Sequence, residues 1–208
     1  MEDVLDVYAR PEDPKRPLVC LDEASKQLLE DSRAPVPQQP GQAARQDYEY
    51  VRQGVCSFFL TFAPLLGRRH ITVTGQRTAK DFAAVIGDLV DVQFPSAEKI
   101  VLVLDNLNTH TKASLYEAFE PAQAKRLADK LEIHYTPKHG SWLNMAEIEL
   151  SVLGRQCLDR RLPDQETLRD EVCAWETARN RAGVTVQWRF TTQDARIKLK
   201  KLYPNVLP

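Results

Sequence analysis

A run of five apolar residues ends directly on an acidic residue near the middle of the chain. The stretch KIVLVLDNLNTH starts at Lys99, and the apolar residues 100–104 are followed at once by Asp105 and Asn106. A short run rich in β-branched residues predicts a strand buried on both faces, as in a parallel sheet. A lone buried carboxylate costs several kcal/mol. The pattern therefore predicts a partner that compensates the charge of Asp105.

An earlier stretch, RPLVCLDEAS, repeats this pattern. Its apolar run from Leu18 to Leu21 leads straight into Asp22. If the two strands are neighbours, Asp22 and Asp105 lie side by side at one edge of the sheet. The predicted helix in NMAEIELSVLGRQCL can bring a third carboxylate, either Glu147 or Glu149. These are two positions apart, about 200° of helical rotation, so only one faces the Asp pair. Glu147, nearer the start of the helix, is our choice.

The other elements follow from periodicity and turn residues. GVCSFFLTFAPLLGRRHITVTG predicts an antiparallel hairpin, and TAKDFAAVIGDLVDVQF a helix with Thr78 as N-cap. KASLYEAFEPAQAKRLADK predicts a helix broken at Pro121, EIHYTP a strand, and DQETLRDEVCAWETARNR a final helix. The buried side of the helix that carries Glu147 is predicted to hold Ile148, Val152, Leu153 and Cys157. The order predicts an α/β fold with a mixed five-stranded sheet and helices on both faces.

Composition and charge narrow the class of protein. A chain of 208 residues with 43% hydrophobic content suits one domain with an ordinary core. The formal charge of −1 provides no general basic signature for nucleic-acid binding, although residues 151–208 contain 11 Lys and Arg against 7 Asp and Glu. That excess can face an anion or be an ordinary solvated surface.

Cysteine usage and hydropathy predict a cytoplasmic protein. Cys20, Cys56, Cys157 and Cys173 lack CxxC spacing and sit within apolar patterns, so we expect reduced core cysteines. No stretch approaches the roughly 20 apolar residues of a membrane span, and the acidic start MEDVLDVYAR is not a signal peptide.

Three converging carboxylates without a Lys or Arg among them repel one another, and a divalent metal removes the repulsion. Mg²⁺ prefers oxygen ligands, and a pair of such ions roughly 3.5–4 Å apart can assist phosphodiester displacement. Each residue also has a structural explanation. Asp followed by Asn often forms a turn or a helix cap, and a Glu in a first helical turn is favourable through the helix dipole.

The motifs VCLDE, VLDNLNTH and SWLNMAEIELSVL together resemble the DDE transposases of the mariner-type superfamily, in its bacterial insertion-sequence branch. The resemblance runs from about Leu18 to Leu158. It supports Glu147, which stands three residues after Asn144 as in the family's Asn-Pro-Ile-Glu pattern, with Met-Ala here in place of Pro-Ile.

The resemblance implies a ribonuclease H-like fold and a DDE triad of Asp22, Asp105 and Glu147, which are both the catalytic and the metal-binding residues. It implies two Mg²⁺ or Mn²⁺ ions per active site and no organic cofactor. The implied activity is cleavage of DNA at element ends and strand transfer into target DNA. The implied partners are both DNAs and a second copy of the chain, in an active homodimer associated with the bacterial nucleoid.

Residues 1–208 are expected to form a single DDE catalytic domain. Within it we expect an N-terminal extension over 1–17, a long loop or excursion over 24–53, where Pro, Gln and Gly concentrate, and a basic tail over 185–208. Longer family members carry helix-turn-helix modules that recognise the element ends. Such a module does not fit before Asp22, so we expect these modules to be absent.

Further residues are candidates for DNA binding. Asn106 can orient a water or a phosphate, or form a turn, and His110 matches the family motif or caps the next helix. In KHGSWLN, Lys138 and His139 can reach phosphates, while Trp142 can stack on a displaced base or belong to the core.

Two other functions compete with the transposase. A ribonuclease H-like nuclease would use the same metal site without strand transfer. An inactive or domesticated remnant would act as a DNA-binding or interaction domain.

Overall fold

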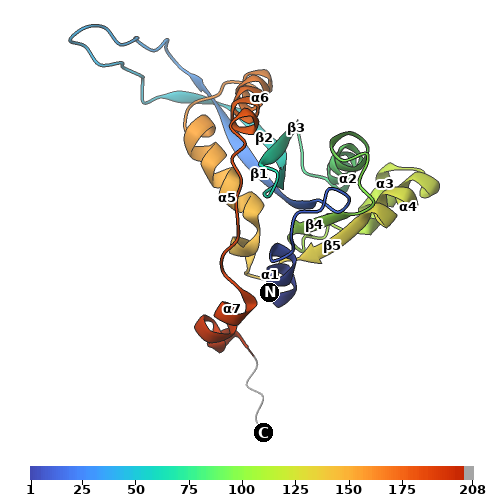
Figure 1. Cartoon of the computed structure of the whole chain (residues 1–208). Coiled ribbons are helices and arrows are strands. Elements are labelled where there is room, and N and C mark those ends of the chain that lie inside the picture. Colours follow the sequence, from blue (N-terminus) through green and yellow to red (C-terminus); the bar gives the residue numbers. More distant parts are fainter. Residues whose placement is uncertain (204–208) are drawn as a thin grey trace.

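The computed structural model describes residues 1–203 and contains a five-stranded sheet in the order β3-β2-β1-β4-β5 (Figure 1). Strands β1, β2 and β3 are antiparallel, whereas β4 is parallel to both β1 and β5. The predicted mixed sheet is confirmed, and the strand before Asp105 is a neighbour of the strand that contains Asp22. The strands are β1 (Leu18–Asp31), β2 (Tyr50–Ala63), β3 (Arg68–Thr74), β4 (Ile100–Leu104) and β5 (Leu131–Tyr135).

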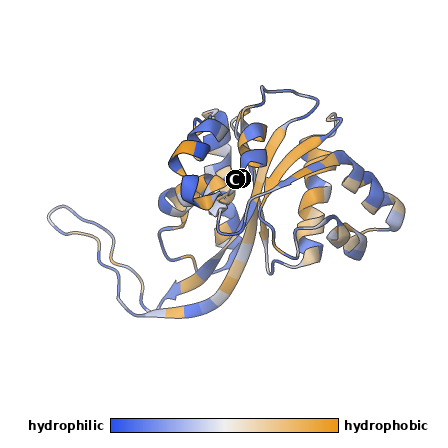
Figure 2. Cartoon of the chain, turned by 90° about the horizontal axis from the view of Figure 1, so that it is seen from below, coloured by the Kyte–Doolittle hydropathy of each residue, from blue (hydrophilic) through white to orange (hydrophobic). Residues whose placement is uncertain are grey.

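Helices cover both faces of the sheet, and Figure 2 shows the hydrophobic strands enclosed between them. One face packs against α2 (Ala79–Asp88), α3 (Lys112–Ala118) and α4 (Pro121–Lys130); the other packs against α1 (Glu2–Tyr8), α5 (Met145–Leu153) and α6 (Gln165–Arg181). The short α7 (Thr192–Lys198) contacts α1. Single helical turns complete the chain: η1 (Leu89–Gln93) and η3 (Gly154–Leu158) extend α2 and α5, η2 (Ser141–Leu143) precedes α5, and η4 (Lys200–Leu202) follows α7.

Several local predictions are confirmed. All residues of β4 are buried, as its apolar run predicts. Thr78 caps α2 through a capping box with Asp81, which satisfies backbone donors at the start of the helix. The helix predicted around Pro121 is divided into α3 and α4, and Pro121 opens α4, where its missing N–H is not needed.

The predicted loop over residues 24–53 is largely wrong. β1 does not stop at Leu21 but continues to Asp31, and β2 starts at Tyr50, so the two strands form an arm that projects from the sheet (Figure 1). Only residues 32–49 form the connection at its tip. Residues 50–55 of β2 are all exposed. On the β1 side only Leu28 is buried. With so few core contacts, the arm shows no sustained alternation of apolar and polar residues that would predict strands.

Two further expectations need correction. The N-terminal extension contains α1, which buries Val4, Leu5, Val7 and Tyr8 in the core; a helix of seven residues is too short for its periodicity to stand out. Cys173 is exposed, whereas the other three cysteines are buried as predicted. Among the described residues, no helix combines the length and apolar character needed to cross a membrane.

Candidate active site

The parallel pairing of β1 and β4 brings Asp22 and Asp105 to the same edge of the sheet. Cys20 of β1 pairs with Val103 of β4, and both belong to the core under α5. Asp22 and Asp105 each follow two residues later in the same direction. Because side chains alternate between faces along a strand, Asp22 lies on the face covered by α5. Asp105 directly follows the last residue of β4.

Asn144 fastens the start of α5 to β1. Its side-chain oxygen accepts a hydrogen bond from the Ala146 N–H at 3.1 Å, and its Nδ2 donates to the Leu21 carbonyl at 2.9 Å. The residue is 1% exposed. Leu21 immediately precedes Asp22, and Asn144 lies three residues before Glu147. This one buried amide therefore connects the strand of Asp22 with the helix turn of Glu147.

The electrostatics of Asp22 reflect this arrangement. Burial raises the pKa of Asp22 to about 7, and the charges of Glu23, Asp105 and Glu147 act in the same direction. The Glu23 N–H donates to Asp22 Oδ1 at 2.9 Å and opposes the rise in pKa only in part. The ionised form of Asp22 is thus destabilised by both of the other predicted triad members.

Glu149 occupies a different environment. It is 1% exposed, and its Oε1 lies 2.9 Å from Nε of the fully buried Arg69. Arg179 on α6 donates to both carboxylate oxygens of Glu149. Two arginines therefore compensate the charge of Glu149 in the interior, away from the Asp pair.

The buried side of α5 differs from the prediction. Ile148 is 41% exposed, and the buried side is formed through Met145, Glu149 and Leu153, each four positions apart. The hydrophobic periodicity predicted the wrong buried side because it treats Glu149, a charged residue, as exposed. The arginines that allow Glu149 to be buried are distant in the sequence. Leu153 and Cys157 are buried as predicted, and Val152 is only partly buried.

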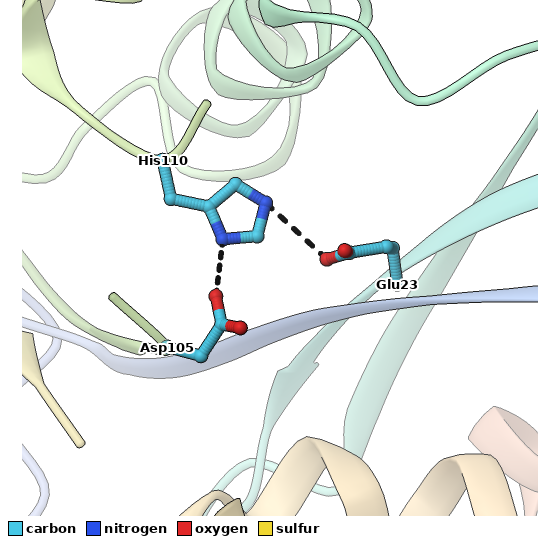
Figure 3. Close-up of side chains that lie close together, drawn as sticks. All are labelled: Glu23, Asp105 and His110. Carbon is cyan, nitrogen blue, oxygen red and sulfur yellow. Dashed lines mark hydrogen bonds and ion pairs between the residues drawn. The ribbon is translucent and has the colours of Figure 1, made fainter. Parts of the chain in front are cut away.

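Asp105 contacts His110, a contact that the sequence did not predict (Figure 3). His110 Nδ1 lies 2.5 Å from Asp105 Oδ1, and Nε2 lies 3.2 Å from Glu23 Oε2. Burial by itself lowers the pKa of His110, yet the hydrogen bonds to Asp105 and Glu23 raise it to about 9. Glu23 was not predicted from the sequence. Strand alternation could have drawn attention to it, because alternation places Glu23 on the opposite face of the sheet from Asp22.

The candidate DNA-binding residues divide by exposure. Asn106, Lys138, His139 and Trp142 are exposed, and Trp142 stacks on Trp188 with ring centroids 6.3 Å apart. His110 is 1% exposed and both of its ring nitrogens face carboxylates. The structure thus places His110 behind Asp105 and away from the surface of the protein.

The triad carboxylates suit a divalent cation with oxygen ligands. Within residues 1–203, neither Asp22 nor Glu147 forms an ion pair with a Lys or Arg side chain. Hard oxygen donors with uncompensated charge match the preference of Mg²⁺. In the described part of the chain, one group of residues has possible metal-ligand atoms that all lie within 4.8 Å of one another: Glu23, Asp105 and His110. The triad carboxylates are more widely spaced than this group.

Comparison with known proteins identifies a family for this chain. A family model described as DDE superfamily endonuclease matches residues 17–169. Curated protein sequences provide no significant match.

Solved structures with a similar fold include complexes of the Mos1 mariner transposase. A paired-end complex with Mg aligns with a TM-score of 0.64 and 14% identity, over 97% of this chain and 60% of that chain. A paired-end complex with Mn aligns with a TM-score of 0.55 and 16% identity, over 87% and 55%. The strand transfer complex aligns with a TM-score of 0.56 and 16% identity, over 84% and 51%. The likeness establishes the ribonuclease H-like fold, and the chain spans less than two thirds of the length of these neighbours.

Proposed function

The chain belongs to the DDE superfamily endonucleases, and from this premise we propose that it is the catalytic domain of a DNA transposase. In this proposal it cleaves DNA at the ends of a mobile element and transfers the freed strands into target DNA. The names of its structural neighbours, paired-end and strand transfer complexes of a mariner transposase, support this choice over a nuclease that only cuts.

The observation that carries the proposal is the convergence of three carboxylates from three separate segments. Asp22 lies on β1, Asp105 follows β4 and Glu147 lies in the first turn of α5. Burial is the first cause of the raised pKa of Asp22, and the charges of Asp105 and Glu147 are close enough to add to it. Removing or pairing the charge of Asp22 would stabilise the metal-free protein, so a role in folding alone does not explain this residue. Accumulated negative charge of this kind is typical of active sites, which trade stability for function.

In the proposed mechanism, Asp22, Asp105 and Glu147 would hold two Mg²⁺ or Mn²⁺ ions. These ions, when bound, would lower the pKa of an attacking water and neutralise charge on the reacting phosphate. Asn144 orients Glu147, because its amide bonds link the helix start to the strand of Asp22. Lys138 and His139, both exposed in the loop between β5 and η2, would contact phosphates of the DNA backbone.

Two exposed side chains near this edge have proposed roles in DNA binding. Trp142 is 45% exposed, and its ring lies among those of Trp188 and Phe190. This arrangement leaves part of an aromatic surface available to a displaced base. Asn106, which follows Asp105, would contact a phosphate. We also propose an active homodimer, since both ends of an element must be processed together.

A nicking and joining assay tests the proposal. Purified chain is incubated with labelled duplex DNA and Mn²⁺ or Mg²⁺, and nicked and joined products are measured. Glu147→Gln should abolish both products, whereas Glu166→Gln should not. Glu166 is a suitable control because it also lies in the first turn of a helix but is exposed on α6.

Equal activity of the wild type and Glu147→Gln would refute the assignment of the site. Metal-dependent nicking without any joined product, even when element ends are supplied, would favour the nuclease. Metal-independent DNA binding without either product would favour the inactive remnant.

A further inference from the structure

Glu23 and His110 have no role in the site as described so far, yet both are almost completely buried beside it. The side chain of Glu23 is 5% exposed and that of His110 is 1% exposed. Phe82 of α2 packs on the imidazole, with ring centroids 4.8 Å apart. The only other cation near Glu23 among the described residues is Arg77, which is mostly exposed and lies 3.9 Å away. A charged pair buried at such cost calls for an explanation.

The two carboxylates lie at opposite nitrogens of one ring (Figure 3). Asp105 Oδ1 faces Nδ1 at 2.5 Å, and Glu23 Oε2 faces Nε2 at 3.2 Å. A single metal ion can bind only one of these nitrogens, so the arrangement does not suit a metal held by all three residues. An imidazole that donates through both nitrogens fits both carboxylates at once.

Asp105 is the member of this group that also belongs to the proposed metal site. Its side chain is 29% exposed, and Oδ1 is the oxygen held by His110. Its other oxygen, Oδ2, has no hydrogen-bond or ion-pair partner among residues 1–203. In metal sites, a ligating carboxylate is commonly fixed by a hydrogen bond to one oxygen while the other binds the ion.

We infer that Glu23 and His110 are a positioning pair for Asp105: Glu23 orients the imidazole, and the imidazole holds Oδ1 so that Oδ2 is available to the metal. This inference rests on the proposed function. In this inference two adjacent residues of β1 have different roles: Asp22, on one face, is a proposed metal ligand, and Glu23, on the other face, acts through His110.

Mn²⁺ binding to the full chain, measured by calorimetry without DNA, tests the inference independently of activity. His110→Asn places an amide donor near the position of Nδ1 and can still hold Asp105, whereas His110→Gln places its amide near Nε2 and cannot. We expect the Mn²⁺ dissociation constant to rise about 10-fold or more in His110→Gln, and about 3-fold or less in His110→Asn. Glu23→Gln retains the volume and an acceptor oxygen, and should raise the constant by an intermediate factor.

His134 provides a matched control. Its ring also lies between two carboxylates, with Nδ1 2.8 Å from Asp3 and Nε2 3.1 Å from Glu132, but neither is a proposed ligand. His134→Gln should leave the Mn²⁺ dissociation constant unchanged. Thermal unfolding of each metal-free variant shows whether it folds; if the His110 variants do not fold, Glu23→Gln alone decides, and an unchanged dissociation constant in it overturns the inference.

The outcomes separate the inference from the proposed function. If the wild type does not bind Mn²⁺, or Asp22→Asn binds it equally well, the proposed metal site fails. If the wild type binds and Asp22→Asn does not, equal affinities in the two His110 variants overturn the positioning role alone. Tighter binding in His110→Gln also overturns it, because the imidazole would then compete with the metal for Asp105.

Discussion

Replacing Asp22 by Asn should stabilise the metal-free protein, and the gain should grow as the pH rises. Asp22 has a pKa of about 7 in the folded chain, compared with 3.8 for an ordinary aspartate, and the first cause is its burial. At a pH between these two pKa values, Asp22 is ionised in the unfolded chain and protonated in the folded chain. Stability is therefore lost as the pH rises from about 4 through about 7. Asn carries no charge at either end of this range, so the variant avoids the loss.

The magnitude follows from the two pKa values. A difference of about 3 pH units at 1.36 kcal/mol each corresponds to about 4 kcal/mol once Asp22 is ionised in both states. At about pH 5 the same relation gives roughly 1.5 kcal/mol, because the folded chain is still protonated. The larger value is an upper bound, since side-chain movement relieves part of the repulsion. The Asn oxygen can still accept the 2.9 Å hydrogen bond from the Glu23 N–H.

Urea unfolding monitored by tryptophan fluorescence, with a chelator present, measures this gain. The free energy of unfolding of Asp22→Asn is compared with that of the wild type at about pH 5 and about pH 8.5, and we expect the difference to grow by about 2–3 kcal/mol. Asp170→Asn, exposed on α6, is the control and should change stability by less than about 0.5 kcal/mol at either pH. A gain that does not change with pH would refute the electrostatic reasoning, and a loss at both pH values would assign Asp22 a structural role.

Three further substitutions test the surroundings of the site by the same unfolding measurement. Asp105→Asn should destabilise the metal-free protein by about 1–3 kcal/mol, because buried His110 loses one of the two negative charges beside it; unchanged stability would contradict the contact. Glu149→Gln should cost about 3–5 kcal/mol, since the fully buried Arg69 loses its compensating charge, and a cost below about 1 kcal/mol would show that Arg69 finds another partner. Asn144→Ala should cost about 1–3 kcal/mol through the lost cap and the lost bond to Leu21. It should also reduce metal-dependent nicking, whereas Asn108→Ala, exposed after β4, should change neither property.

Local patterns in the sequence were sufficient for most elements and for the candidate triad. The apolar run of β4, the capping box at Thr78 and the break at Pro121 each depend on residues within a few positions of one another. Asp22 and Asp105 were found because each follows a buried run directly. That β1 and β4 are neighbours was the condition for bringing Asp22 and Asp105 together, and the structure meets this condition.

The tertiary structure alone decided how charges are compensated. Glu149 is buried because Arg69 and Arg179, distant in the chain, reach it from β3 and α6. Glu23 reaches His110 across 87 positions (110 minus 23), and both lie behind Asp105. Residues 50–55, on the β2 side of the arm, are all exposed, and Leu28 is the one buried residue of β1 beyond Leu21, so the pairing of the arm leaves no periodic signal. Periodicity records which side of one element is apolar, whereas the partner of a buried charge depends on how separate elements pack, and no single segment of the sequence contains that information.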